Sequence, residues 1–210
     1  SAKSQNNFYI KKTYSDIKKL SNLFHVFPSL VVVHVFQSRS LFLREFHKKK
    51  VADWVVAFVP PKNISHIYIV DDKERNISRK ILGQVLLHET THLYTNVLNT
   101  NLPDWLSEGI AVYVAAQIFK PSISVADWKN ITQKGIPFKG MRWSIATKYN
   151  GYTIAGLLVM YFVRRYGWKK FITAISHHPT QKRITMINIT SYFDENLDQL
   201  MVDFKKQFVK

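Results

Sequence analysis

Cysteine is absent from the 210 residues of this chain. The absence excludes disulfides, thiolate metal ligands and a thiol nucleophile. Any zinc site would therefore use histidine and carboxylate ligands, which are typical of catalytic rather than structural zinc. Because disulfide-free proteins occur on both sides of a membrane, the missing cysteines leave the compartment open.

Long apolar runs are also missing. No stretch reaches the length of about 18 apolar residues that a membrane-spanning helix needs, so we expect no transmembrane segment. The first residues lack an initiator Met and a signal-like apolar core, which indicates a trimmed or processed product. Together with the basic charge, these features favour a secreted or cell-surface protein in an anionic envelope, with a cytoplasmic location as the alternative.

Acidic residues are scarce, with 14 Asp and Glu against 30 Lys and Arg and a formal net charge of +16. Such a charge favours anionic partners such as acidic substrates, a phosphate-rich envelope or nucleic acid. The alternative is a solvated basic surface with no specific partner. Because zinc-finger spacing, an aromatic RNA-binding signature and a helix-turn-helix pattern are all missing, we expect no specific nucleic-acid partner.

What the chain does contain is enough apolar sequence for a core, at 46% hydrophobic and 14% aromatic residues. The patterns predict an α+β fold and one domain with two lobes, an α/β lobe over 1–77 and a helical lobe over 78–210. Pro103 and Asp104 mark a helix start, with Asp104 as the N-cap. The expected helices are 9–27, 40–50, 78–98, 104–119, 152–166, 168–176 and 197–209, the expected strands are 30–36, 54–59 and 64–70, and 121–142 is expected to be a long loop.

Two histidines in the predicted helix 78–98 have metal-ligand spacing. His88 and His92 are four residues apart, so they lie one turn apart on the same helix face. Both imidazoles can then reach one ion at about 2.0–2.1 Å. Glu89 projects about 100° around the helix from His88, where it reaches a water rather than the ion. This is the general-base position of a His-Glu-x-x-His metallopeptidase.

The same helix carries an apolar stripe on a different face. Its members are Leu82, Leu86, Leu93 and Val97. The stripe can anchor the helix while both histidines face a cleft. The alternative is a pair of ordinary histidines on a partly buried helix, with the glutamate merely capping a neighbour.

A third candidate ligand follows 16 residues after the second histidine. Glu108 lies among apolar and small residues, where an unpaired carboxylate would be costly to bury and a metal ion would relieve the cost. Small residues on its face, Ala111, Val112 and Ala115, would allow close packing against the helix that carries the histidines. The alternative is a surface carboxylate that pairs with one of the many lysines.

These segments resemble the peptidase MA-like group of gluzincins. Proteins of that group carry His-Glu-x-x-His on one helix and Trp-x-x-Glu-Gly-x-Ala on the next, and this chain has HETTH at 88–92 and WLSEGIA at 105–111. A weaker similarity extends to YNGY at 149–152 and YFVRRYG at 161–167. The matching motifs cover roughly residues 78–170, and the zinc pair is the specific part.

The resemblance implies a zincin-like fold with an active-site cleft between the lobes, and peptide-bond hydrolysis. It implies Zn²⁺ as cofactor, held by His88, His92 and Glu108, with Glu89 as the catalytic general base. Many gluzincins place an Asp four residues beyond the ligand Glu, where it supports a ligand His. This chain has Val112 there, so that support must come from elsewhere.

The tetrahedral intermediate of peptide hydrolysis needs a hydrogen-bond donor for its oxyanion. Tyr152 or Tyr149 is the candidate by position, with the pair 177–178 (HH) as the competing source. Either tyrosine, judged alone, is better explained by core packing. The strand 64–70 is a candidate edge strand that would pair with the substrate backbone.

The other histidines, His25, His34, His47 and His66, show no ligand spacing and are expected to be ordinary packed or surface residues. The basic runs 48–50 and 164–165 are expected to be solvated.

The predicted function is a zinc-dependent peptidase that hydrolyses peptide bonds with a metal-activated water and Glu89 as general base. One alternative is a zincin-fold protein that acts mainly as a binding module for an anionic surface or partner. Another is a nucleic-acid-binding protein with an accidental motif. A peptide or protein is the expected substrate, and the segment 121–142 is expected to contribute to its selection.

Overall fold

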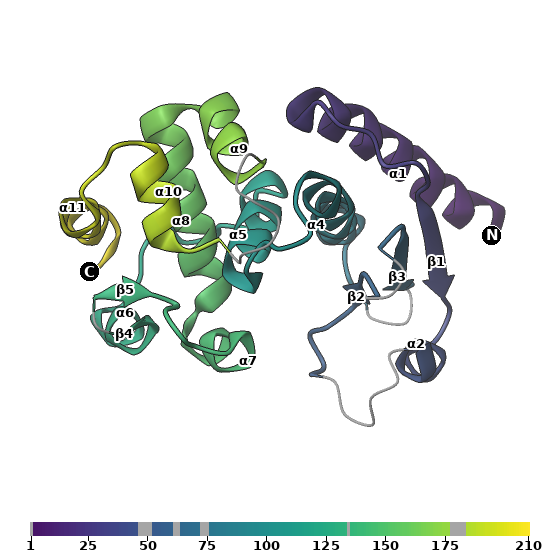
Figure 1. The fold of residues 1–210 in the computed structure, drawn as a ribbon. Helices are drawn as coiled ribbons and strands as arrows, with labels where there is room; N and C mark the ends of the chain where they lie inside the picture. The colour runs from purple at the N-terminus through teal and green to yellow at the C-terminus, as the bar shows by residue number, and fades with distance from the viewer. Residues whose placement is uncertain (1, 46–51, 61–63, 72–75, 134, 177–183) are drawn as a thin grey trace. The chain divides into compact units, whose positions relative to one another are not determined.

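The chain has an α+β fold that is mostly helical and contains a small three-stranded mixed sheet (Figure 1). The computed structural model describes the whole chain except residues 1, 46–51, 61–63, 72–75, 134 and 177–183. It divides into two units, Ser1–Val97 and Leu98–Lys210. The lobe boundary predicted after residue 77 differs from this division, because the helix that follows is grouped with the first unit.

In the sheet of the first unit, the order of the strands differs from their order along the chain. In chain order it contains α1 (Ala2–Phe24), β1 (Val32–Phe36), α2 (Arg39–Glu45), β2 (Ala57–Phe58), β3 (His66–Val70) and α4 (Arg79–Leu98). The strand order is β1-β3-β2, with β1 parallel and β2 antiparallel to β3. The expectation that 64–70 is an edge strand is therefore wrong, since β3 is paired on both sides.

Alternation along β3 sends its side chains to two layers. Ile67 and Ile69 are fully buried and belong to one apolar core with Leu82, Leu86 and Leu93 of α4. On the other face, aromatic side chains of the strands surround the fully buried Phe42 of α2, whose ring centroid lies 5.3 Å from that of Phe58. The sheet thus carries α4 on one face and α2 on the other, as Figure 1 shows.

The second unit is a helical assembly around α8. In chain order it contains α5 (Asp104–Val114), α6 (Val125–Ile131), β4 (Thr132–Gln133), β5 (Ile136–Pro137), α7 (Trp143–Ala146), the 3₁₀ helix η1 (Thr147–Tyr149), α8 (Gly151–Tyr166), α9 (Trp168–Ser176), α10 (Met186–Tyr192) and α11 (Leu197–Phe208). Buried rings fill its interior, among them Phe162, Phe171 and Phe204.

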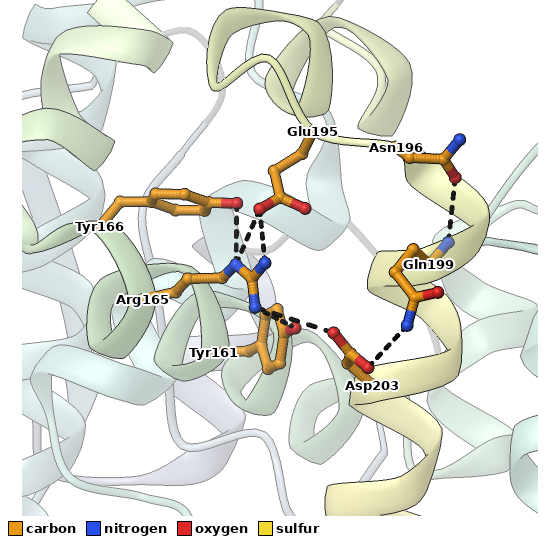
Figure 2. Close-up of polar contacts among 7 residues, drawn as sticks. All are labelled: Tyr161, Arg165, Tyr166, Glu195, Asn196, Gln199 and Asp203. Carbon is orange, nitrogen blue, oxygen red and sulfur yellow. Dashed lines mark hydrogen bonds and ion pairs between the residues drawn. The ribbon is translucent and has the colours of Figure 1, made fainter.

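A polar network joins the end of α8 to α11 (Figure 2). Arg165 donates to Glu195 Oε1 from Nε at 2.9 Å and from Nη2 at 2.6 Å, and its Nη1 lies 3.7 Å from Asp203 Oδ2. The hydrogen bond from Tyr166 lowers the pKa of Glu195 against the opposing effect of burial, and Arg165 lowers it further. Arg164 and Arg165 are both exposed, as expected for 164–165, and Arg165 takes part in these ion pairs as well.

Several predicted elements differ from the observed ones at their ends. The first helix stops at Phe24 instead of reaching residue 27, because His25 takes a left-handed conformation with φ 56°. Likewise α5 ends at Val114, and Ala116 has φ 53°. The N-cap of α5 is Pro103, so the assignment of Asp104 as N-cap is wrong; Asp104 is the first helical residue, where an acid still suits the helix dipole.

The segment 121–142 is not one long loop. It contains α6 and the hairpin β4–β5, and the N-cap Ser124 accepts a hydrogen bond from the Asp127 N–H at 3.0 Å. The sequence prediction also omitted α7 and α10, which have only four and seven residues. Elements this short carry too few apolar positions for a period to be recognised. Within the described residues, none of the helices has both the length and the apolar character needed to cross a membrane.

Candidate metal centre

Helix α4 is held in the first unit by a hydrogen-bonded tyrosine. Tyr94 is fully buried, and its hydroxyl donates to the Ile17 carbonyl at 3.0 Å and lies 2.7 Å from Ser21 Oγ. Burial raises the pKa of Tyr94, so the phenol stays neutral and can donate. These bonds tie α4 to α1 only two residues beyond His92.

The apolar side of α4 provides the second anchor. Leu82, Leu86 and Leu93 are at most 1% exposed and lie in the sheet core, as the predicted stripe requires. Val97 was predicted to extend this stripe, but it is 46% exposed, so that part of the prediction is wrong. The stripe ends before the last turn of the helix.

The two residues between the histidine-glutamate pair and the second histidine need no outside partner. Thr90 and Thr91 are fully buried, and their hydroxyls donate to the carbonyls of Leu86 and Leu87, each at 2.7 Å. Because each threonine bonds back to its own helix, two hydroxyls are buried at little cost. Helix α4 continues without a break through the motif.

The motif residues themselves are largely shielded from solvent. His88 and Glu89 are each 8% exposed, and His92 is half-buried. The two imidazole rings lie 4.9 Å apart and 79° to one another, one turn apart on α4. The predicted common face of the two histidines is confirmed.

Glu108 is half-buried on α5, and the close approach of α5 to α8 holds it in place. A Cβ at Gly109 would lie 2.6 Å from the Ala155 carbonyl oxygen, and one at Gly156 would lie 2.6 Å from Val112 Cγ1. Glycine at both positions lets the two helix backbones come together. Val112, predicted to face the histidine helix, thus packs on α8.

His88, His92 and Glu108 each offer one ligand atom, and these atoms lie within 4.8 Å of one another. Ligands at about 2.0–2.2 Å from one ion are at most about 4.4 Å apart, twice the bond length. The limit of 4.8 Å on the separations of the three atoms is close to this value. The cluster can hold a metal ion, as the spacing predicted.

The predicted oxyanion donors lie at the start of α8. Tyr152 is half-buried in its first turn, with its ring centroid 5.0 Å from that of Trp143 in a T-shaped contact. Tyr149 is the last residue of η1 and is also half-buried. The catalytic role of either tyrosine stays a prediction. The competing pair 177–178 lies outside the described residues.

One histidine pair was not recognised in the sequence. His34 Nε2 lies 2.8 Å from His66 Nδ1, with the rings stacked at 4.9 Å. Burial lowers the pKa of His34, and the neighbouring His66 lowers it further. Each strand contributes a single histidine, so only the parallel register of β1 and β3 brings them together. Of the other two histidines without ligand spacing, His25 is exposed, and His47 lies outside the described residues.

No protein-family model, curated protein or solved structure matches this chain. The assignment of the site therefore depends on the chain's own residues and their geometry. The resemblance of its motifs to the gluzincins stays a prediction, as does the zincin-like character of the fold.

Proposed function

We propose that this protein is a zinc-dependent peptidase of the gluzincin type, which hydrolyses peptide bonds in a peptide or protein substrate. The observation that carries the proposal is that ligand atoms of His88, His92 and Glu108 lie within 4.8 Å of one another. The buried Glu89 beside the first of these residues supplies the group that such a reaction needs in addition.

The donor set suits zinc better than the other common biological cations. Two imidazole nitrogens and one carboxylate oxygen match the three-ligand pattern of catalytic zinc, which leaves one coordination position for water or substrate. Calcium and magnesium prefer six or more oxygen ligands, which two histidines do not provide. The absence of cysteine also disfavours metals that select thiolate ligands.

Bound zinc would supply two effects, a lower pKa for water and polarisation of the scissile carbonyl. The protein's own residues would manage the protons. Glu89 would accept a proton from the attacking water and return it to the leaving amine nitrogen. Tyr152 or Tyr149 would donate a hydrogen bond to the carbonyl oxygen as its negative charge develops.

The direct test combines metal analysis with a cleavage assay. We expect one zinc per chain in the wild-type protein and none in His88→Ala. The control His25→Asn removes an exposed histidine and suits the left-handed backbone at that position, so it should keep its zinc. Casein or a peptide library would report cleavage.

Glu89→Gln separates metal binding from chemistry. The variant keeps the shape of the side chain but removes the base, so we expect retained zinc and a loss of at least about 100-fold in kcat/KM, at the lower end of general-base contributions. Full activity in Glu89→Gln would refute the assigned role of this residue. A wild-type protein without zinc would refute the proposal as a whole.

The alternative is a protein that keeps the site but acts by binding an anionic surface, and the net charge of +16 supports it. It predicts stoichiometric zinc without cleavage, together with binding to anionic phosphatidylserine vesicles that weakens as salt rises. Zinc-dependent cleavage that Glu89→Gln abolishes would favour the peptidase.

A further inference from the structure

The second unit contains a cavity of about 630 Å³ at the start of α5. Three segments that are far apart in the sequence form its walls, namely 103–105, 136–144 and 184–187. The volume falls within the range of about 300–1,000 Å³ that is usual for small-molecule and side-chain sites. The segment 136–144 contributes most of the wall, through the end of the β4–β5 hairpin and the start of α7.

Aromatic rings form one side of this cavity. Trp105 and Phe138 are stacked with centroids 5.8 Å apart and only 6° between their planes, and the ring of Trp143 lies 5.9 Å from that of Phe138. Flat parallel rings of this kind bind another ring or a planar group well. The remaining apolar wall comes from prolines, isoleucines and methionines of the same three segments.

The backbone at Phe138 is strained. Phe138 has φ 58°, in the left-handed region that bulky residues rarely adopt, yet its side chain is only 7% exposed. Two backbone hydrogen bonds hold this conformation, from the Phe138 N–H to the Ile131 carbonyl at 3.1 Å and from the Met141 N–H to the Phe138 carbonyl at 3.2 Å. Such strain is concentrated at functional sites, and here it places a ring in the cavity wall.

The polar and charged groups around the cavity indicate which chemical group a ligand would carry beside its aromatic ring. The indole N–H of Trp143 is buried and finds no acceptor among the described residues. Lys139 and Arg142 lie exposed at the cavity, against one acid, Asp104. The excess of positive charge favours a ligand that carries a carboxylate beside the ring.

The cavity is close along α5 to the proposed metal ligand. Trp105 precedes Glu108 by three residues, which places the two side chains on neighbouring positions of one helix face. The rise between them is about 4.5 Å. An extended peptide advances about 3.3–3.6 Å per residue, so one or two residues span this distance.

We infer that this cavity is the specificity pocket of the proposed peptidase, that it binds an aromatic substrate side chain within two residues of the scissile bond, and that Lys139 and Arg142 favour an acidic residue beside it. The inference rests on the proposed function. The expectation that 121–142 contributes to substrate selection agrees with it, although the walls also need 184–187.

Binding can be tested without catalysis in zinc-free Glu89→Gln protein. The probe is N-acetyl-Phe-Asp-amide, compared with N-acetyl-Ala-Asp-amide and N-acetyl-Phe-Asn-amide. In ¹⁵N-tryptophan-labelled protein we expect the indole resonance of Trp143, assigned through Trp143→Phe, to shift on titration. The Phe probe should bind at least about 10-fold more tightly than the Ala probe, because it buries a ring. N-acetyl-Phe-Asp-amide should bind more tightly than N-acetyl-Phe-Asn-amide, and only at low salt.

Ser144→Trp places a large ring at the cavity, and Ser122→Trp is the matched control at an exposed serine outside it. We expect Ser144→Trp to weaken the Phe probe at least about 10-fold and Ser122→Trp to leave it unchanged. The indole signals of Trp128 and Trp168 report whether the second unit stays folded. Equal binding of the Phe and Ala probes, or unchanged binding in a folded Ser144→Trp, would overturn the pocket.

Cleavage by zinc-loaded wild-type protein distinguishes this inference from the proposed function. One outcome is cleavage that shows no preference for an aromatic residue near the scissile bond and that Ser144→Trp leaves unchanged. That result would support the peptidase and overturn the specificity pocket. Binding of the Phe probe by a protein that cleaves nothing would keep an aromatic binding site and overturn the peptidase.

Discussion

Single side chains of the metal cluster differ in how the fold holds them. His88 is 8% exposed on a helix that is anchored by the leucine stripe and by Tyr94. Glu108 is half-buried on α5, next to the glycine contact with α8. Glu108 can thus be changed with less disturbance of a core than His88.

Glu108→Gln tests that contribution. The neutral amide oxygen is a weaker ligand for a divalent cation than a carboxylate, so we expect zinc affinity to fall by more than about 10-fold, the lower limit for residues that only support a ligand. Competition with a chelating dye measures the affinity. Asp104→Asn removes an acid from the same helix and should leave it unchanged. Equal affinities in the two variants would exclude Glu108 as a ligand.

The packing around two helical glycines explains why each position can or cannot take a larger residue. At Gly109 an added Cβ would meet the backbone of Ala155, which cannot move independently of α8. At Gly83 an added Cβ would meet only the end of the Lys12 side chain, 3.1 Å away. Gly109 is therefore required for the close packing of two helix backbones, whereas Gly83 has no such backbone contact.

Gly109→Ala should lower the free energy of unfolding by about 1–3 kcal/mol, the usual cost of overpacking. Gly83→Ala should not lower it, because alanine is favoured over glycine in a helix by up to about 1 kcal/mol and the lysine side chain can move. Chemical denaturation of both variants measures the difference. A similar loss in both would show that the α5–α8 contact is not the cause.

The network between α8 and α11 makes stability depend on pH. The pKa of Glu195 lies below its ordinary value of 4.5 because the folded state favours the carboxylate. Its contribution is therefore fully present above pH 4.5 and is lost as pH falls through the lower folded-state pKa. The pKa of Tyr166, raised to about 12 by burial and by its bond to Glu195, keeps the phenol protonated and able to donate at neutral pH.

Glu195→Gln should cost about 1 kcal/mol at pH 7, the scale of a well-formed, partly exposed ion pair. The difference from wild type should shrink as pH falls below 4.5 and the wild-type carboxylate becomes protonated. Urea unfolding at several pH values provides the measurement. Asp194→Asn removes the neighbouring charge at an exposed residue with φ 53°, which asparagine also tolerates, and should have little effect. A pH-independent difference would contradict the assignment.

At the scale of the whole molecule, the positive charge is spread evenly. Each unit has 15 Lys and Arg against 7 Asp and Glu, which gives an excess of 8 in each and 16 in the chain. The charge therefore does not single out one unit as a binding module. It favours association with anionic partners in general, including an acidic peptide substrate.

Metal removal is the corresponding test on the whole protein. A ligand that binds only the folded state stabilises it by about 2.7 kcal/mol at 100 times its Kd. For a chain of this size that corresponds to a rise in Tm of about 5–10 °C, at about 2–4 °C per kcal/mol. We expect a chelator to lower the wild-type Tm by this amount and to leave His88→Ala unchanged. A chelator-induced shift of equal size in His88→Ala would place the stabilising metal elsewhere.

Local periodicity predicted three helices closely, placed the start of α1 at residue 9 instead of Ala2, and predicted the short elements poorly. The helix 168–176 was predicted with its observed ends, and α4 and α8 each start within one residue of the prediction. By contrast, the strand expected over 54–59 has only two residues, Ala57–Phe58. A short strand is defined by the neighbour it pairs with, and no local pattern contains that information.

The sequence by itself indicated the three residues that could hold a metal ion, because the spacing of His88 and His92 on a helix is a local property and Glu108 is distinguished by its apolar neighbours. Only the tertiary structure decided the central place of β3 and the pairing of His34 with His66, both of which depend on register between distant strands. It alone also decided the aromatic cavity, whose walls come from three separate segments. Contacts between distant segments follow from packing of the whole chain, which no short pattern encodes.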